Sequence, residues 1–204
     1  MTQQAMDDRM TKAQEYLRHQ GAKSLADLGA LIDRTAIDWE RCLDGMIDAQ
    51  ALFKPSTPTG PEGEDEWCAK EVLGHVLASQ RGLNVTIAQM AGVEPPAEAE
   101  QIRAMGVKSE DDEARSLAYL RPRIAAVCEE SKRLVTSLPE GEKLAQRFPH
   151  PVFGQLNLKE WFAFHRVHAM DHIQQIEAIK ADAGYPAGQT QDSGSRTQDS
   201  SSQS

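Results

Sequence analysis

Apolar residues recur every three to four positions along four stretches of this chain, which is the period of an amphipathic helix. The stretches are residues 25–51, 67–91, 109–138 and 157–183. Short runs that alternate between apolar and polar residues, the mark of half-buried strands, are scarce. The pattern therefore predicts an all-α fold in which four helices pack together as a four-helix bundle.

Polar residues at the ends of these stretches indicate where two of the helices begin. Asp27 follows Ser24 by three positions, and Glu160 follows Asn157 by three, the spacing of a capping box at a helix N-terminus. Within the third stretch, Pro122 lacks the backbone N–H that a helix interior uses. We therefore expect that helix to be kinked or split at the proline.

The connections between the stretches are rich in Pro, Gly and acidic residues, which predict loops. Residues 54–66 predict a loop, and residues 92–106 predict a long connection with a short helical turn. Residues 139–156 predict a further loop, in which residues 148–154 form an extended turn.

One domain with an extension at each end is the expected organisation. Residues 1–23 form an N-terminal extension with a short helix near 7–19, and residues 24–184 form the bundle domain. Residues 185–204 are mostly Gln, Ser, Thr and Asp. Such a segment buries too little apolar surface to offset its chain entropy, so we expect this tail to be disordered.

An acidic charge balance narrows the classes of partner. The 204 residues include 31 Asp and Glu against 22 Lys and Arg, a net charge of −9. Duplex nucleic acid and anionic membrane surfaces attract the opposite balance, so neither is expected as a partner. No apolar run reaches the roughly 18 residues of a transmembrane helix, and the polar N-terminus does not resemble a signal peptide.

The cysteines indicate a reducing compartment. Cys42, Cys68 and Cys128 are odd in number and widely spaced, and they form no CxxC pair. Reduced thiols and a cytoplasmic location are the simplest expectation. The alternative, that one of them is a nucleophile, has no neighbouring histidine in the sequence to support it.

Three histidines of the last stretch carry the strongest chemical signal. At about 100° per residue, His165, His168 and His172 fall within roughly 60° of one another on the helix. Trp161 and Ile176 share that sector, so the histidines are expected to face the core. His168 and His172 are four residues apart, a spacing at which two imidazoles can bind one metal ion. Alternatively, they form a hydrogen-bonded cluster or a face turned to water.

A third ligand has to come from another helix, because catalytic zinc sites usually have three protein ligands. His75 is the best placed candidate, at the border of the apolar stripe of the second helix. His19 lies in the polar N-terminal extension and His150 lies between two prolines. Taken by itself, His75 can also be an ordinary residue at the border of the stripe.

Two segments resemble the DinB-like family (DinB/YfiT) of four-helix metalloenzymes. The first is residues 67–80 (WCAKEVLGHVLASQ) and the second is residues 168–176 (HAMDHIQQI). Residues 151–161 (PVFGQLNLKEW) are similar to the family's approach to the last helix, and the whole resemblance spans residues 25–183. The matching motif positions are Trp67, His75, His168, His172, Gln175 and Ile176.

The resemblance implies that the bundle brings His75, His168 and His172 together on one divalent metal, of which Zn, Ni and Fe are candidates. His165 is then expected to support the ligands or line the pocket. One position departs from the family: relatives often carry Asp directly after the first histidine of the last helix, where this chain has Ala169. The nearby Asp171 is expected on another side of the helix.

Three histidines leave coordination positions of the metal open, which favours catalysis. A zinc ion with open positions lowers the pKa of bound water and deprotonates a bound thiol. Members of the resembled family include transferases and isomerases that use low-molecular-weight thiols such as bacillithiol or mycothiol. We therefore expect a metal-dependent enzyme that acts on a small molecule, either as a thiol transferase in detoxification or as a hydrolase. Residues 149–155 are expected to shape its entrance, and a homodimer is a further expectation from the resemblance.

The general base is the least defined part of this hypothesis. Glu71, one turn before His75, is the best guess from the sequence. Its ordinary alternative is a surface acid. The alternative function is a non-catalytic metal- or ligand-binding helical module with a stress-related role. A third possibility is a structural bundle whose histidine cluster binds no metal.

Overall fold

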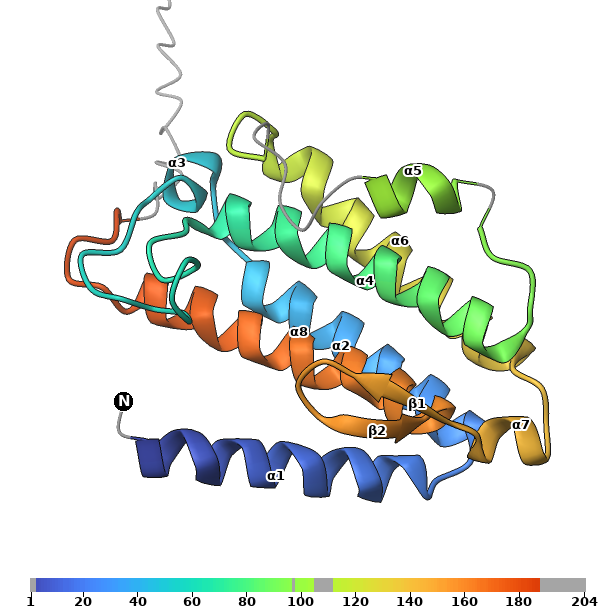
Figure 1. Ribbon diagram of the computed structural model, residues 1–204. Helices are drawn as coiled ribbons and strands as arrows, with labels where there is room; N and C mark the ends of the chain where they lie inside the picture. Colours follow the sequence, from blue (N-terminus) through green and yellow to red (C-terminus); the bar gives the residue numbers. More distant parts are fainter. Residues whose placement is uncertain (1–2, 97, 105–111, 188–204) are drawn as a thin grey trace, which may run out of the picture.

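A computed structural model of the chain describes residues 3–96, 98–104 and 112–187 (Figure 1). The elements in chain order are α1 (Gln3–Gly21), α2 (Leu25–Leu43), α3 (Asp48–Ala51), α4 (Ala69–Ala91), α5 (Ala99–Ala104), α6 (Leu117–Ser137), α7 (Glu142–Ala145), β1 (Arg147–His150), β2 (Gly154–Asn157) and α8 (Leu158–Lys180).

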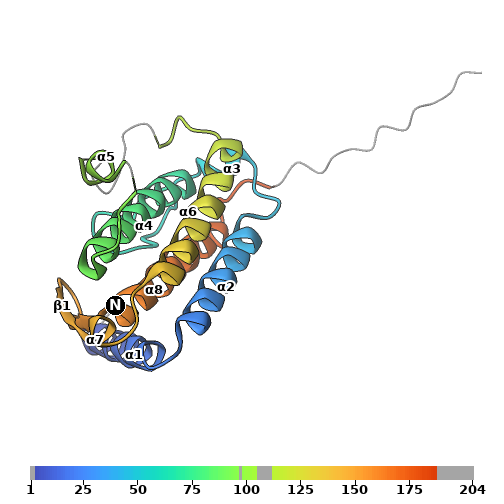
Figure 2. The same ribbon diagram turned by 90° about the vertical axis from the view of Figure 1, so that its right-hand side faces the viewer.

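Four long helices form the bundle that the sequence predicts. α2 and α4 each pack against both α6 and α8, so the four helices enclose one core. Seen from the side in Figure 2, α8 lies inside the group, with α4 and α2 beside it and α1 along its outer surface. The predicted all-α four-helix bundle is confirmed.

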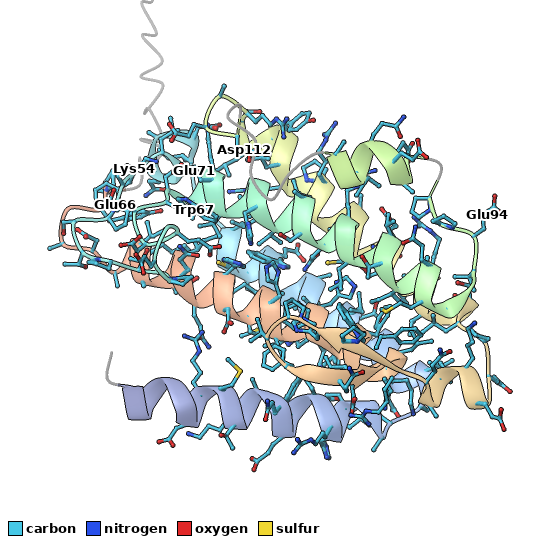
Figure 3. The ribbon with its side chains drawn as sticks, viewed as in Figure 1. Lys54, Glu66, Trp67, Glu71, Glu94 and Asp112 are labelled. Atoms are coloured by element: carbon cyan, nitrogen blue, oxygen red, sulfur yellow. The ribbon has the colours of Figure 1, made fainter. Side chains whose placement is uncertain are left out.

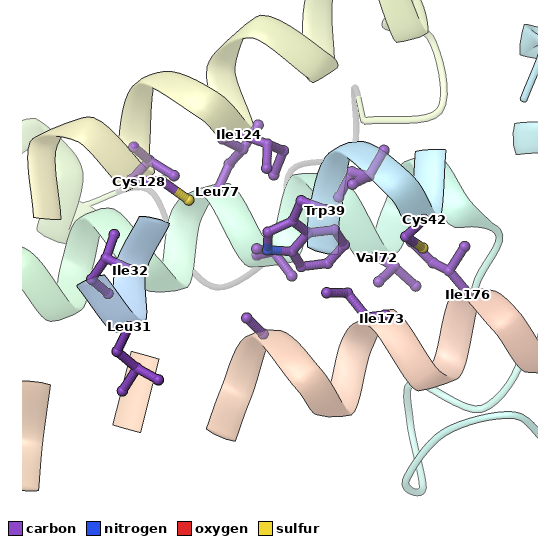
Figure 4. Close-up of a cluster of buried hydrophobic side chains, with 14 of the residues drawn as sticks. Leu31, Ile32, Trp39, Cys42, Val72, Leu77, Ile124, Cys128, Ile173 and Ile176 are labelled. Carbon is purple, nitrogen blue, oxygen red and sulfur yellow. The ribbon is translucent and has the colours of Figure 1, made fainter. Parts of the chain in front are cut away.

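The core fixes how α4 and α8 lie relative to each other. Trp39 of α2 is 1% exposed and lies at the centre of the bundle, near Val72 of α4 and Ile173 of α8 (Figure 4). A buried aromatic ring of this size contributes a large apolar contact area to the core. α4 and α8 are thereby held side by side along the length that carries the histidines.

Two of the predicted helices differ from the observed ones. The first stretch is divided, because α2 ends at Leu43 and Gly45 takes a left-handed φ of 68° before α3 begins. The third helix begins at Leu117, where the Ser116 side chain accepts a hydrogen bond from the Tyr119 amide. Pro122 lies inside this helix without splitting it. Residues 109–111 of the predicted helix lie outside the described residues.

The predicted extended turn is a two-stranded antiparallel hairpin. β1 and β2 pair from Arg147 opposite Asn157 to His150 opposite Gly154, and Gly154 supplies the φ of 72° that the turn requires. Asn157 then caps α8: its side chain accepts from the Glu160 amide at 2.9 Å, and Glu160 accepts from the Asn157 amide at 2.8 Å. The predicted capping box is confirmed, and it fixes the first turn of the helix that carries His168 and His172.

Both ends of the described chain dock on the bundle. α1 is longer than predicted, and it packs along α8 through the buried Leu17 and an ion pair of 2.6 Å from Arg9 to Asp171. At the other end the Tyr185 ring packs edge-on against Phe53. Residues 188–204 of the tail predicted to be disordered lie outside the described residues. None of the helices that the structure describes is long and apolar enough to cross a bilayer.

Candidate metal centre

The three predicted metal ligands meet between α4 and α8. His75 comes from the second turn of α4, and His168 and His172 lie one turn apart on α8. Nε2 of His168 is 3.2 Å from Nε2 of His75 and 3.2 Å from Nε2 of His172. One ligand nitrogen from each ring lies within 4.8 Å of the other two, so these three residues could hold a metal ion.

The distances fit one ion bound by three imidazoles. With Zn–N bonds of 2.0–2.1 Å in a tetrahedral arrangement, neighbouring ligand nitrogens lie about 3.3 Å apart. The two Nε2–Nε2 distances of 3.2 Å are close to this value. His75 is 6% exposed and His172 is 5% exposed, so the alternative of a helix face turned to water is wrong.

Burial keeps the central ring neutral. The pKa of His168 is held well below its ordinary value, first by burial and then by its histidine neighbours His172, His75 and His165. A neutral imidazole is the form that binds a metal. A hydrogen-bonded cluster without a metal satisfies the rings less well than a shared metal ion does. The single Nε2 of His168 faces two other Nε2 atoms but can make only one hydrogen bond.

Neighbouring side chains hold the other two rings. Nδ1 of His172 lies 2.9 Å from Oε1 of Gln175, whose Nε2 donates to the backbone oxygen of Glu64 at 2.7 Å. Trp67 lies against His75, with the ring centroids 5.1 Å apart. Gln175 and Trp67 are motif positions in the sequence, but their contacts depend on the loop before α4, which spacing within α8 does not reveal.

Glu64 places a carboxylate near the histidines. It is half-buried in this loop, and burial raises the pKa of its carboxyl, although its neighbour His172 lowers that pKa. Glu64 could not be predicted from the sequence, because nothing in its local pattern separates it from the other acids of residues 62–66.

Glu71, the general base suggested by the sequence, lies in an ion-pair cluster at the start of α4 (Figure 3). Its Oε2 accepts from the Cys68 amide at 2.9 Å and from Lys54, and Lys54 also pairs with Glu113 at 2.8 Å. Cys68, Glu71 and Glu113 have the spacing of a second metal cluster. The Lys54 ammonium already supplies the positive charge between the two carboxylates, so this cluster needs no ion. The role of Glu71 as a general base stays a prediction.

His165 lies outside the group of three converging nitrogens. It is 1% exposed beside Phe162, and neither ring nitrogen has a hydrogen-bond partner among the described residues. Burial lowers the pKa of His165 to about 3, so the ring is neutral. The suggestion that His165 supports the ligands stays a prediction, and the structure shows no hydrogen bond that carries it.

An aromatic cluster connects the hairpin to the histidines. His150 lies among Phe153, Trp161 and Phe164, and its Nδ1 accepts from the amides of Val152 and Phe153. Phe164 in turn lies 5.9 Å from His168, centroid to centroid. The hairpin therefore forms part of the surroundings of the site.

The cysteines do not provide a reactive thiolate. All three are free and buried. Burial raises the pKa of Cys42 to about 12 and of Cys128 to about 11, and it also raises the pKa of Cys68. Thiols with such pKa values stay protonated near neutral pH, so the alternative of a cysteine nucleophile has no support in the structure.

Comparison with known protein families matches the part of the chain that forms the bundle and holds the three histidines. A family model described as the DinB superfamily matches residues 31–176, which include most of α2, all of α4 and the three converging histidines. The chain belongs to the DinB superfamily. Its similarity to a protein of Bacillus subtilis (strain 168), named uncharacterized protein YuaE, is 24% identity over 150 residues, covering 68% of this chain and 88% of that protein.

The structure shows where the residue after His168 lies in this DinB-superfamily protein, which has Ala169 where relatives often have Asp. Ala169 is fully buried, so a carboxylate at this position would lie in the core. Asp171 instead points toward α1, where it pairs with Arg9. The acid next to the histidine pair therefore docks a helix and does not face the three converging nitrogens.

Proposed function

We propose that this protein is a metal-dependent enzyme that binds one divalent transition metal through His75, His168 and His172 and activates a low-molecular-weight thiol. The observation that carries the proposal is the pair of 3.2 Å Nε2–Nε2 distances at a buried site. Three neutral histidines leave coordination positions open, whereas a structural zinc site is normally closed by four protein ligands. When bound, such an ion deprotonates a thiol.

The chain's own groups support this chemistry in three ways. Burial of His75 and His172 excludes water from the protein side of the site. Trp67 and Phe164 line it with aromatic surface, which suits the apolar part of a small electrophilic substrate. Gln175 holds the His172 ring in place. Three free, buried cysteines agree with the proposed cytoplasmic location.

Hydrolysis is the second candidate, and the position of Glu64 favours it. Glu64 is half-buried, and its backbone oxygen accepts from the Gln175 amide that contacts His172, so we propose that its carboxylate accepts a proton from a water at the site. We propose Glu64 as a second candidate for the general base beside Glu71, because Glu71 is already paired with Lys54.

Metal analysis is the first test. Protein purified without a metal-binding tag and loaded with zinc is expected to retain about one ion per chain after gel filtration, whereas His75→Ala or His168→Ala retains about one-tenth or less. His19→Ala is the matched control, since His19 is an exposed histidine on α1. Equal metal content in all four proteins would refute the three-histidine site.

A reactivity assay then separates the chemistries. The zinc-loaded protein is mixed with an aromatic electrophile and with bacillithiol, mycothiol, cysteine or glutathione in turn. Conjugation that is lost in His168→Ala supports thiol transfer, and ester hydrolysis lost in both His168→Ala and Glu64→Gln supports the hydrolase. Metal binding with neither turnover would support the non-catalytic module instead.

A further inference from the structure

The amide of Gln175 has only one orientation that satisfies both of its neighbours. The backbone oxygen of Glu64 can only accept a hydrogen bond, so the group 2.7 Å from it must be the Nε2 amine of Gln175. The other end of the amide, Oε1, therefore faces Nδ1 of His172 at 2.9 Å. An oxygen acceptor there requires Nδ1 to carry the proton.

This hydrogen bond determines the tautomer of a metal ligand. With the proton on Nδ1, the lone pair of the neutral His172 ring lies on Nε2. Nε2 is the atom that lies 3.2 Å from Nε2 of His168. The side chain that fixes the ring is itself 3% exposed, so water does not substitute easily for either of its two bonds.

The loop is shaped to receive this amide. A Cβ on Gly60 would lie 2.6 Å from Nε2 of Gln175, so a larger residue would displace the amide. The loop is closed on itself by bonds from Thr59 N to Asp65 O at 3.1 Å and from Glu64 N to Pro61 O at 2.9 Å. Trp67, at its end, packs on His75. The loop thus reaches two metal ligands from outside the bundle.

We propose that Gln175 is a positioning residue that couples metal binding at His172 to the conformation of residues 59–65. The coupling rests on the proposed metal site and is reciprocal: a loop held by Gln175 raises metal affinity, and a bound metal stabilises the loop. Because the bond is made to the backbone of Glu64, the same amide also holds the segment of the loop that carries that carboxylate.

Three substitutions separate the two halves of the coupling. Gln175→Leu removes both bonds. Gln175→Glu keeps an oxygen acceptor for Nδ1 of His172 but places an oxygen against the Glu64 carbonyl, which releases the loop. Gly60→Ala leaves Gln175 unchanged and pushes the loop from its amide. Gln89→Glu, on the exposed side of α4, is the control for the added charge.

The experiment measures zinc affinity by chelator competition, and amide hydrogen exchange of residues 59–66 with and without zinc. Gln175→Leu is expected to lower zinc affinity about 10- to 100-fold, as the loss of partners of ligating histidines typically does. Zinc should slow exchange in the wild type and Gln89→Glu, but not in Gln175→Leu. Gln175→Glu, which keeps the acceptor for His172 but releases the loop, should lower zinc affinity less than Gln175→Leu does and should lose the slower exchange of the loop.

The outcomes distinguish this inference from the proposed function. Wild-type zinc affinity and wild-type loop exchange in a folded Gln175→Leu or Gly60→Ala protein would overturn the coupling and leave the metal site standing. A wild-type protein that binds no zinc would overturn both. Coupling observed in a protein without turnover would support the inference and count against the enzyme.

Discussion

His165 is a titratable ring in the core, so its contribution to the free energy of unfolding should depend on pH. Burial lowers its pKa to about 3, whereas in an unfolded chain it is near 6.5. As pH falls below 6.5, the unfolded chain binds a proton that the folded protein does not, so stability falls toward pH 3. In His165→Leu, the loss of unfolding free energy from pH 7 to pH 5 should be about 2 kcal/mol smaller.

Urea unfolding of metal-free wild type and His165→Leu at both pH values measures this difference. The other histidines are common to the two proteins, so their contributions cancel in the comparison. An identical pH dependence would show that the His165 ring gains a hydrogen-bond partner or water in solution.

The sequence predicts which side chains lie together only when they belong to the same helix. The three-residue and four-residue spacings of α8 placed His165, His168 and His172 on a common face, and His168 and His172 do converge. The same spacing could not separate His165, whose nitrogens are left without partners. Glu64 is 111 positions from Gln175, and such a contact has no local signature.

At the scale of elements, the capping box at the start of α8 should contribute measurably to stability. Asn157→Ala removes the acceptor of the Glu160 amide and leaves that donor in a half-buried turn. We expect a loss of about 1 kcal/mol in the free energy of unfolding, as for other N-cap residues.

Chemical denaturation compares this variant with Asn157→Asp, which retains an acceptor oxygen and should stay within a few tenths of a kcal/mol of the wild type. A full loss in both variants would mean that Asn157 acts through the hairpin and not as a cap.

Where the predicted start of a helix was wrong, contacts with other elements determine the observed start. The sequence predicts the third helix from residue 109, but Asp112 lies before the observed helix and is buried against α4, where a Cβ on Gly74 would collide with its carboxylate. Asp112 also pairs with Arg115 at 3.0 Å. The helix begins at Leu117 instead, with Ser116 as its cap.

At the scale of the whole molecule, a metal between α4 and α8 should stabilise the bundle. At a free zinc concentration 1,000-fold above the dissociation constant, binding adds about 4 kcal/mol to the folded state. For a domain of this size that corresponds to a rise of about 10 °C in the unfolding midpoint. Scanning calorimetry with zinc and with EDTA measures the shift, and His75→Ala should show almost none. A shift of equal size in His75→Ala would place the stabilising ion elsewhere.

The bundle, but not the meeting of its histidines, follows from the sequence pattern. Periodicity predicts four amphipathic helices, and any of several packing orders would bury them. His75 was a candidate ligand from its place at the border of the apolar stripe and from the family resemblance, but no spacing relates α4 to α8. In the structure, the contacts of both helices with α2 and α6 settle that order.

The 93 positions that separate His75 from His168 also bear on how the site comes into being during synthesis. α8 is made after α4, so the nascent chain holds only one of the three histidines of the proposed site until α8 has been synthesised. The proposed site can therefore bind a metal through all three histidines only after α8 has been added to the chain, so its metal-free form precedes its loaded form during synthesis.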